Sequence, residues 1–163
     1  MAKGELIEAL IDRIKKKAEA YESVLSLSLK EREKAAAGDV EGLEKIGSEK
    51  EAFTLSLKSL DGEIAGILKG VSLALGGREV TVEAIRTVNK AAADELSSLM
   101  ESAGSLVSRI LDAEKVNQKL YGEKIAQIKD ELSRLRQSRK MNYAYNRADD
   151  DLLGGPKFID RKK

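Results

Sequence analysis

The spacing of apolar residues between Val40 and Leu75 constrains the fold of this chain more than any other feature. Its members follow one another in alternating steps of three and four, and they are Leu43, Ile46, Lys50, Phe53, Leu57, Leu60, Ile64, Ile67, Val71 and Ala74. A sustained spacing of 3.5 residues is typical of a helix in a coiled coil. Lys50 is the one charged member, and its stem can lie on apolar surface while its amine stays in water. We therefore predict a long packed helix over 40–75.

Two further helices are predicted on either side of this one. The first covers 4–37, where the apolar positions are Ile7, Ile11, Ile14, Ala18, Tyr21 and Leu25, with Leu6, Leu10, Val24 and Leu27 beside them. Gly38 suits a left-handed helix cap, and Asp39 suits the N-cap of the next helix. Gly76-Gly77 begins a second turn and Thr81 is a candidate N-cap, so a third helix is predicted over 82–140. In the second helix Gly62, Gly66 and Gly70 either admit a close neighbour or loosen the helix end.

The predicted fold is all-α: an antiparallel, up-down-up three-helix coiled coil with a long, projecting third helix and an irregular C-terminal tail. We expect one helical domain over 1–140 and a flexible tail over 141–163. The first two helices would each be roughly 50 Å long and the third roughly 90 Å, at about 1.5 Å per residue. The end of the third helix would therefore extend past its neighbours.

The apolar stripe of the third helix changes phase where its neighbours are expected to end. Up to that point its members are Leu96, Leu99, Ala103, Leu106, Ile110, Ala113 and Asn117. Beyond it the apolar residues are Leu120, Tyr121, Ile125, Ile128, Leu132 and Leu135. An amphipathic helix without an intrachain partner is either a binding surface or an aggregation hazard. A break at Gly122 would instead fold this segment back as ordinary core, and Asn117 is expected to set the register as a polar core residue.

Composition argues against several classes of function. Of the 163 residues, 29 are Lys or Arg and 28 are Asp or Glu, so no overall charge attracts nucleic acid or membrane. The chain has no Cys, which excludes disulfides, Cys-ligated zinc and thiol catalysis. It also has no His, which removes the commonest general base and metal ligand. Asp149–Asp151 lacks the pattern of a calcium loop, and Gly76-Gly77-Arg78 lacks the residues of a phosphate loop. We expect no metal, no cofactor, no membrane insertion and a cytoplasmic protein, with an enzyme as the least expected class.

A basic cluster precedes two tyrosines near the end of the predicted third helix. Its members are Arg134, Arg136, Arg139 and Lys140, followed by Tyr143 and Tyr145. Aromatic side chains beside basic ones can stack on single-stranded nucleic acid, which keeps an RNA-binding adaptor as an alternative. Cations also stabilise a helix C-terminus, and the acidic residues on both sides of the cluster favour that interpretation. No nucleic-acid partner is therefore expected.

Several segments together resemble the FlgN family of flagellar type III export chaperones. The segment from Leu27 to Phe53 is similar to the family's first hairpin, with its Gly-Asp turn and its Glu-Lys-Glu. Val116-Asn-Gln-Lys-Leu120 resembles the Asn-containing segment of the family's third helix. The ending Leu153-Gly-Gly-Pro-Lys-Phe-Ile-Asp-Arg-Lys-Lys163 looks like the short tails seen there.

The resemblance implies a chaperone without enzymatic activity. FlgN-like chaperones bind the C-terminal helical regions of hook–filament junction proteins, prevent premature association and deliver them to the membrane export gate. The residues that would bind the junction protein are Leu120, Tyr121, Ile125, Ile128, Leu132 and Leu135. Tyr143 or Tyr145 would dock on the cytoplasmic domain of the export gate. The alternative is a homo-oligomeric coiled-coil scaffold, in which the extended helix pairs with a second copy of the chain.

Overall fold

The computed structural model describes residues 2–153 of the chain, and the side chains of residues 2–147. It has four helices in this range: α1 (Lys3–Ala37), α2 (Val40–Ala74), α3 (Val82–Arg86) and α4 (Lys90–Leu153). No strand occurs among the described residues, which confirms the all-α prediction. The chain divides into two units, residues 1–120 and residues 121–163.

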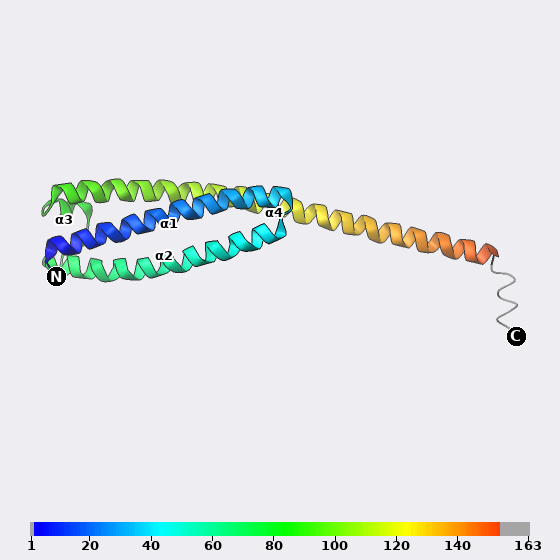
Figure 1. The fold of residues 1–163 in the computed structure, drawn as a ribbon, viewed down its shortest axis with the longest axis horizontal. Coiled ribbons are helices and arrows are strands. Elements are labelled where there is room, and N and C mark those ends of the chain that lie inside the picture. The colour runs from blue at the N-terminus through cyan, green and yellow to red at the C-terminus, as the bar shows by residue number, and fades with distance from the viewer. Residues whose placement is uncertain (1, 154–163) are drawn as a thin grey trace. The chain divides into compact units, whose positions relative to one another are not determined.

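In the first unit, α1, α2 and the first part of α4 run alongside one another (Figure 1). Ion pairs join Lys17 to Asp61 and Lys50 to Glu31, so low numbers on α1 meet high numbers on α2 and the two helices are antiparallel. Lys15 pairs with Glu95 of α4 near the start of both helices. These directions agree with an up-down-up arrangement, while strict coiled-coil packing stays a prediction.

One apolar cluster fills the end of the first unit where α1 and α4 begin. Its buried members are Ile7, Leu10, Ile11, Val71, Ile85, Ala92, Ala93 and Leu96. The stripe predicted on α2 is buried or half-buried along its whole length. The predicted period therefore identifies the face that α2 turns toward its neighbours. Among the three off-stripe glycines, only Gly70 has a close neighbour, because a Cβ there would lie 3.2 Å from Leu6.

Both predicted turns have the expected cap residues. Gly38 adopts the left-handed conformation at φ 69°, and the Asp39 carboxylate accepts a hydrogen bond from the Gly42 amide at 2.9 Å. Gly76 and Gly77 also have positive φ, and the Thr81 hydroxyl accepts from the Ala84 amide at 3.0 Å. Helices α1 and α2 consequently begin and end within one residue of the predicted bounds.

The third predicted helix, 82–140, begins at Val82 as predicted, but it is not continuous and it does not end at residue 140. It is interrupted after Arg86, and α4 begins only at Lys90. The Thr87 hydroxyl donates to the Ala84 carbonyl at 2.7 Å, and the Asn89 side chain accepts from the Ala92 amide at 3.1 Å. Such side-chain bonds to the backbone compete with a continuous helix and explain the break.

Helix α4 also continues past residue 140, to Leu153. The first part of the predicted tail, 141–153, is therefore helical and not irregular. These residues include no Gly or Pro, and Asp costs a helix only about 0.7 kcal/mol relative to Ala. The glycines and the proline that oppose a helix come later, at 154–156, outside the described residues together with the rest of the tail.

Candidate functional site

Five predicted binding residues lie on one face of α4 in the second unit. Their positions step by four, three, four and three, which keeps side chains on one side of a helix; they are Tyr121, Ile125, Ile128, Leu132 and Leu135. We call these five residues the apolar strip. Leu120 belongs to the first unit and is half-buried, and its position lies about a quarter turn from the strip. The strip therefore holds five of the six residues selected from the sequence.

The aliphatic members of the strip are exposed to an unusual degree. The exposed fraction is 54% for Ile125, 55% for Ile128, 47% for Leu132 and 60% for Leu135. Isolated exposed apolar residues are ordinary, whereas four at helical spacing form a contiguous surface. Tyr121 differs, because it is half-buried and has an interaction of its own.

Charged residues border the strip. The Arg134 guanidinium pairs with the Asp130 carboxylate at 3.1 Å, one helical turn away. Leu135 lies in a shallow hollow with Glu131, Arg134 and Ser138. An apolar centre with a charged border is the usual composition of a surface that accepts an amphipathic helix.

Tyr143 and Tyr145 are both exposed, with exposed fractions of 69% and 74%. They lie within α4 and not in an irregular tail. Residues two positions apart on a helix face different directions. Helical geometry places Tyr143 near the edge of the strip's face, and Tyr145 about a third of a turn from it. The two tyrosines therefore face different directions on the helix, which distinguishes them as candidates for docking. Their spacing in an extended tail would not distinguish them.

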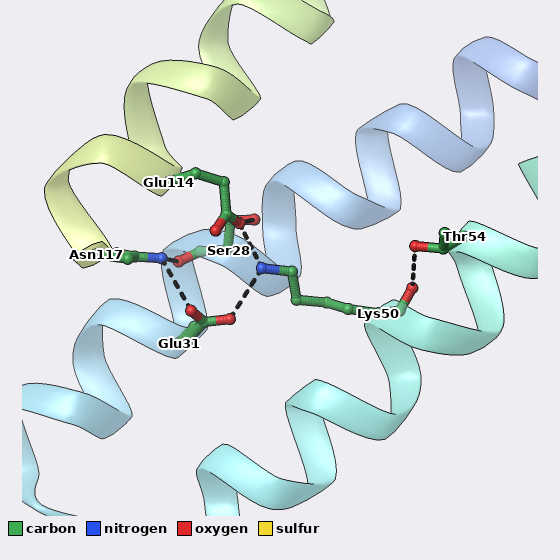
Figure 2. Close-up of polar contacts among 6 residues, drawn as sticks. All are labelled: Ser28, Glu31, Lys50, Thr54, Glu114 and Asn117. Atoms are coloured by element: carbon green, nitrogen blue, oxygen red, sulfur yellow. Dashed lines mark hydrogen bonds and ion pairs between the residues drawn. The ribbon is translucent and has the colours of Figure 1, made fainter. Parts of the chain in front are cut away.

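The first unit contains a set of buried and half-buried polar side chains that was not predicted as a site from the sequence. Figure 2 shows side chains from three helices converging there. The residues are Ser28 and Glu31 of α1, Lys50 of α2, and Glu114 and Asn117 of α4. We call these five residues the polar cluster. Its sequence signals were a lysine in the apolar stripe of α2 and an asparagine in that of α4.

The Lys50 amine is the centre of the polar cluster (Figure 2). It donates hydrogen bonds to Glu31 at 2.9 Å and to Glu114. The prediction that this amine extends into water is therefore wrong. Burial acts to lower the pKa of Lys50, but the hydrogen bonds to Glu114 and Glu31 outweigh it and the pKa is raised. Burial likewise acts to raise the pKa of Glu114, but hydrogen bonds from Lys50 and Ser28 outweigh it and the pKa is lowered. Both groups are therefore held in their charged forms.

Asn117 fixes α4 to α1. Its side-chain amide donates to the Ser28 carbonyl at 2.9 Å and makes a longer contact of 3.5 Å to Glu31. Asn117 is 1% exposed, and its Oδ1 atom is buried without a hydrogen-bond partner. The Ser28 hydroxyl donates to Glu114 at 2.6 Å. This geometry fits the prediction of a register-setting polar residue.

Two further features considered from the sequence are a metal site and a membrane-spanning helix. Among residues whose side chains are described, no group of His, Cys, Asp or Glu could hold a metal ion. Asp149–Asp151 is outside that set. Within the described part of the chain, no helix is long and apolar enough to cross a membrane.

The family model described as FlgN protein matches residues 1–150, which is most of the chain. The chain belongs to the FlgN family. FlgN proteins are flagellar export chaperones and not enzymes, so this FlgN chain has a general role as a chaperone of flagellar export. No curated protein and no solved structure matches it.

Proposed function

We propose that this FlgN chain binds the C-terminal helical regions of hook–filament junction proteins in the cytoplasm. By covering those regions it prevents premature association, and it then delivers the junction protein to the export gate. The observation that carries this proposal is the row of four aliphatic residues, each about half exposed, on one face of α4. A partner helix laid along this face would remove the row from water.

The size of the apolar strip limits how tightly it can bind. Burying a large aliphatic side chain completely contributes roughly 1.5–3 kcal/mol, so covering four that are about half exposed contributes roughly 3–6 kcal/mol. Association itself costs about 4 kcal/mol or more. The strip alone would give a weak, rapidly released complex. The partner must therefore add contacts with the charged border, and a complex of this kind suits a cargo that has to be handed on.

A capture experiment tests the placement of the binding site. In the double variant Ile128→Asp/Leu132→Asp, two carboxylates lie in the middle of the strip, and we expect at least about a tenfold loss of affinity for junction proteins. The matched control is Ala126→Asp, an exposed position on the opposite side of the same helix. Capture that is equal for the double variant, the control and the unchanged chain would refute the strip as the binding site.

Docking on the export gate is proposed through one of the two exposed tyrosines. Tyr143 is the stronger candidate because it lies near the edge of the strip's face, where a bound partner and the gate could be contacted together. We expect Tyr143→Ala to reduce secretion of junction proteins while capture of those proteins is unchanged. Tyr145→Ala provides the comparison. If neither variant changes secretion, gate docking does not depend on these tyrosines.

A further inference from the structure

A row of basic residues continues the face of α4 that carries the apolar strip. Counted from Leu132, the next positions on that face are four, seven and eight residues further along the helix. They hold Arg136, Arg139 and Lys140, and all three side chains are exposed. We call these three residues the basic row. Within the second unit, one face of α4 therefore changes from apolar to basic along its length.

The nearest carboxylates lie on the other side of the helix. Asp130 and Arg134 are each rotated by about 160° from Leu132, and they pair with each other at 3.1 Å. No Asp or Glu occurs from residue 132 to residue 148, so no member of the basic row has a carboxylate three or four positions away. These are the spacings at which side chains on a helix meet. The charges of the basic row are thus not neutralised by neighbours on the helix.

The stability of α4 does not explain the basic row. Cations stabilise a helix within its last turn, but α4 continues to Leu153, about three and a half turns past Lys140. Arg136 stands three and four positions before Arg139 and Lys140, and like charges at these spacings destabilise a helix. A row of cations on the binding face, unfavourable for the helix itself, indicates a ligand of opposite charge.

We propose that the partner helix has an acidic segment next to its apolar segment, and that its carboxylates pair with the basic row. The apolar segment covers the strip, and the acidic segment lies beside Arg136, Arg139 and Lys140. The strip and the row together extend roughly 30 Å along α4, so one continuous helix can contact both. This pairing requires that a helix occupies the strip, and in that respect it rests on the proposed function.

The order of the two segments favours a helix over a lipid surface or a nucleic acid. A helix that lies in a membrane surface keeps its apolar residues on one face and its cations on the other. Here Arg139 lies about two turns beyond Leu132 on the same face, where the acyl chains would have to bury its charge. A nucleic acid offers phosphates to the basic row but no row of aliphatic side chains to cover Ile125 and Ile128. An amphipathic helix can offer both.

The basic row would select among partners more than it would tighten binding. Exposed ion pairs contribute little affinity, but complementary charges speed association and like charges exclude wrong partners. The apolar strip alone would accept many amphipathic helices. With the row beside it, helices that have an acidic segment are preferred and helices that have a basic segment are rejected.

Synthetic helical peptides test the inference without any junction protein. Two peptides share one apolar segment, and the segment after it carries Glu in one peptide and Gln in the other. At low salt the full chain should bind the Glu peptide at least about fivefold more tightly. This preference should shrink as added salt screens the charges. Equal affinity for the two peptides at low salt overturns the inference.

Charge reversal tests whether the contact lies on the basic row. Arg139→Glu should weaken binding of the Glu peptide by at least about tenfold, because like charges then face each other. Arg134→Glu is the matched control, since it makes the same change of charge on the opposite side of the same segment. A peptide with Lys in its second segment should bind Arg139→Glu more tightly than it binds the unchanged chain. Equal effects of the two substitutions on the Glu peptide overturn the placement.

The same variants separate this inference from the proposed function. Equal capture of junction proteins by the unchanged chain and by Arg139→Glu would retain the proposed partner and refute the acidic contact. Preference for the Glu peptide without capture of junction proteins would retain the acidic contact and refute the proposed partner. Vesicles of phosphatidylglycerol or single-stranded RNA could instead bind the chain and lose binding in Arg139→Glu. That result, with no preference between the peptides, assigns the row to lipid or to nucleic acid and overturns the inference.

Discussion

Lys50 connects α2 to carboxylates on α1 and α4. The energetics of these contacts indicate what the polar cluster contributes to the fold. Ion pairs that are shielded from water contribute little net stability, because desolvation offsets the attraction. The unpaired Oδ1 atom of Asn117 costs about 1–3 kcal/mol. An apolar cluster of the same shape would therefore be at least as stable. We infer that the polar cluster sets the alignment of the three helices, since sliding any one of them would leave charges unpaired.

Removing the amine of Lys50 should destabilise the first unit. Lys50→Met leaves the Glu31 and Glu114 carboxylates without their cation in a largely shielded position. Lys50 and Glu114 keep side-chain exposures of 20% and 32%, so the expected cost is about 1–3 kcal/mol, which is below that of a fully buried pair. Thermal unfolding followed by circular dichroism measures it. The control Lys45→Met, at an exposed position of α2, should change little, and equal stability of the two variants would contradict the prediction.

The same cluster predicts a dependence of stability on pH. The pKa of Glu114 is lowered from 4.5, so its contribution is present above about pH 4.5 and is lost as the pH falls through the lowered value. The pKa of Lys50 is raised from 10.5, so its contribution is present below that pH and is lost as the pH rises through the raised value. The difference in unfolding temperature between the unchanged chain and Glu114→Gln should be constant from about pH 6 to 9 and should shrink below pH 4.5. A difference that grows on acidification would contradict this assignment.

At the scale of elements, the apolar period and the cap residues were sufficient to predict where helices α1 and α2 begin and end. The stripe from Leu43 to Ala74 and the Gly38-Asp39 turn defined α1 and α2 because each has a strong local cause. The break between α3 and α4 was missed because Thr87 and Asn89 cost a helix only about 0.7 kcal/mol each, and side-chain bonds to the backbone decide the outcome. The Lys50 contacts were missed because spacing along one helix does not show which charges face it from the others.

The cap at the start of α4 gives a prediction at this scale. The Asn89 side chain accepts a hydrogen bond from the Ala92 amide at 3.1 Å. Asn89→Ala removes that acceptor and should lower the free energy of unfolding by about 1 kcal/mol. Asn142→Ala, inside the helical range of α4, should have no comparable effect. Chemical denaturation of both variants measures the difference, and equal midpoints would show that the cap is dispensable.

At the scale of the whole molecule, the chain separates into two units with different character. The first has a buried apolar core and the polar cluster, whereas in the second every residue from Ile125 to Arg147 is exposed. Stability should therefore reside in the first unit and partner binding in the second. The domain boundary expected from the sequence is at residue 140, whereas the two units divide after residue 120. The phase change of the apolar stripe after Asn117 lies close to this point, because the stripe shifts where the requirements of packing end.

Truncation tests the separation directly. A chain that ends at Leu120 should unfold cooperatively, with an unfolding temperature within a few degrees of that of the full chain, because the core and the cluster are retained. Circular dichroism and differential scanning calorimetry measure this. The same truncated chain should lose capture of junction proteins. Failure of the truncated chain to fold would mean that residues after 120 contribute to its stability.

The exposure of Ile125 to Arg147 also affects how long each copy survives in a cell. A helix whose side chains are all in water opens readily, and its lysines and arginines, such as Lys129 and Arg136, then become cleavage sites for proteases. Any occupant of the strip slows that opening. Copies whose strip is occupied should therefore resist proteolysis longer than unoccupied copies.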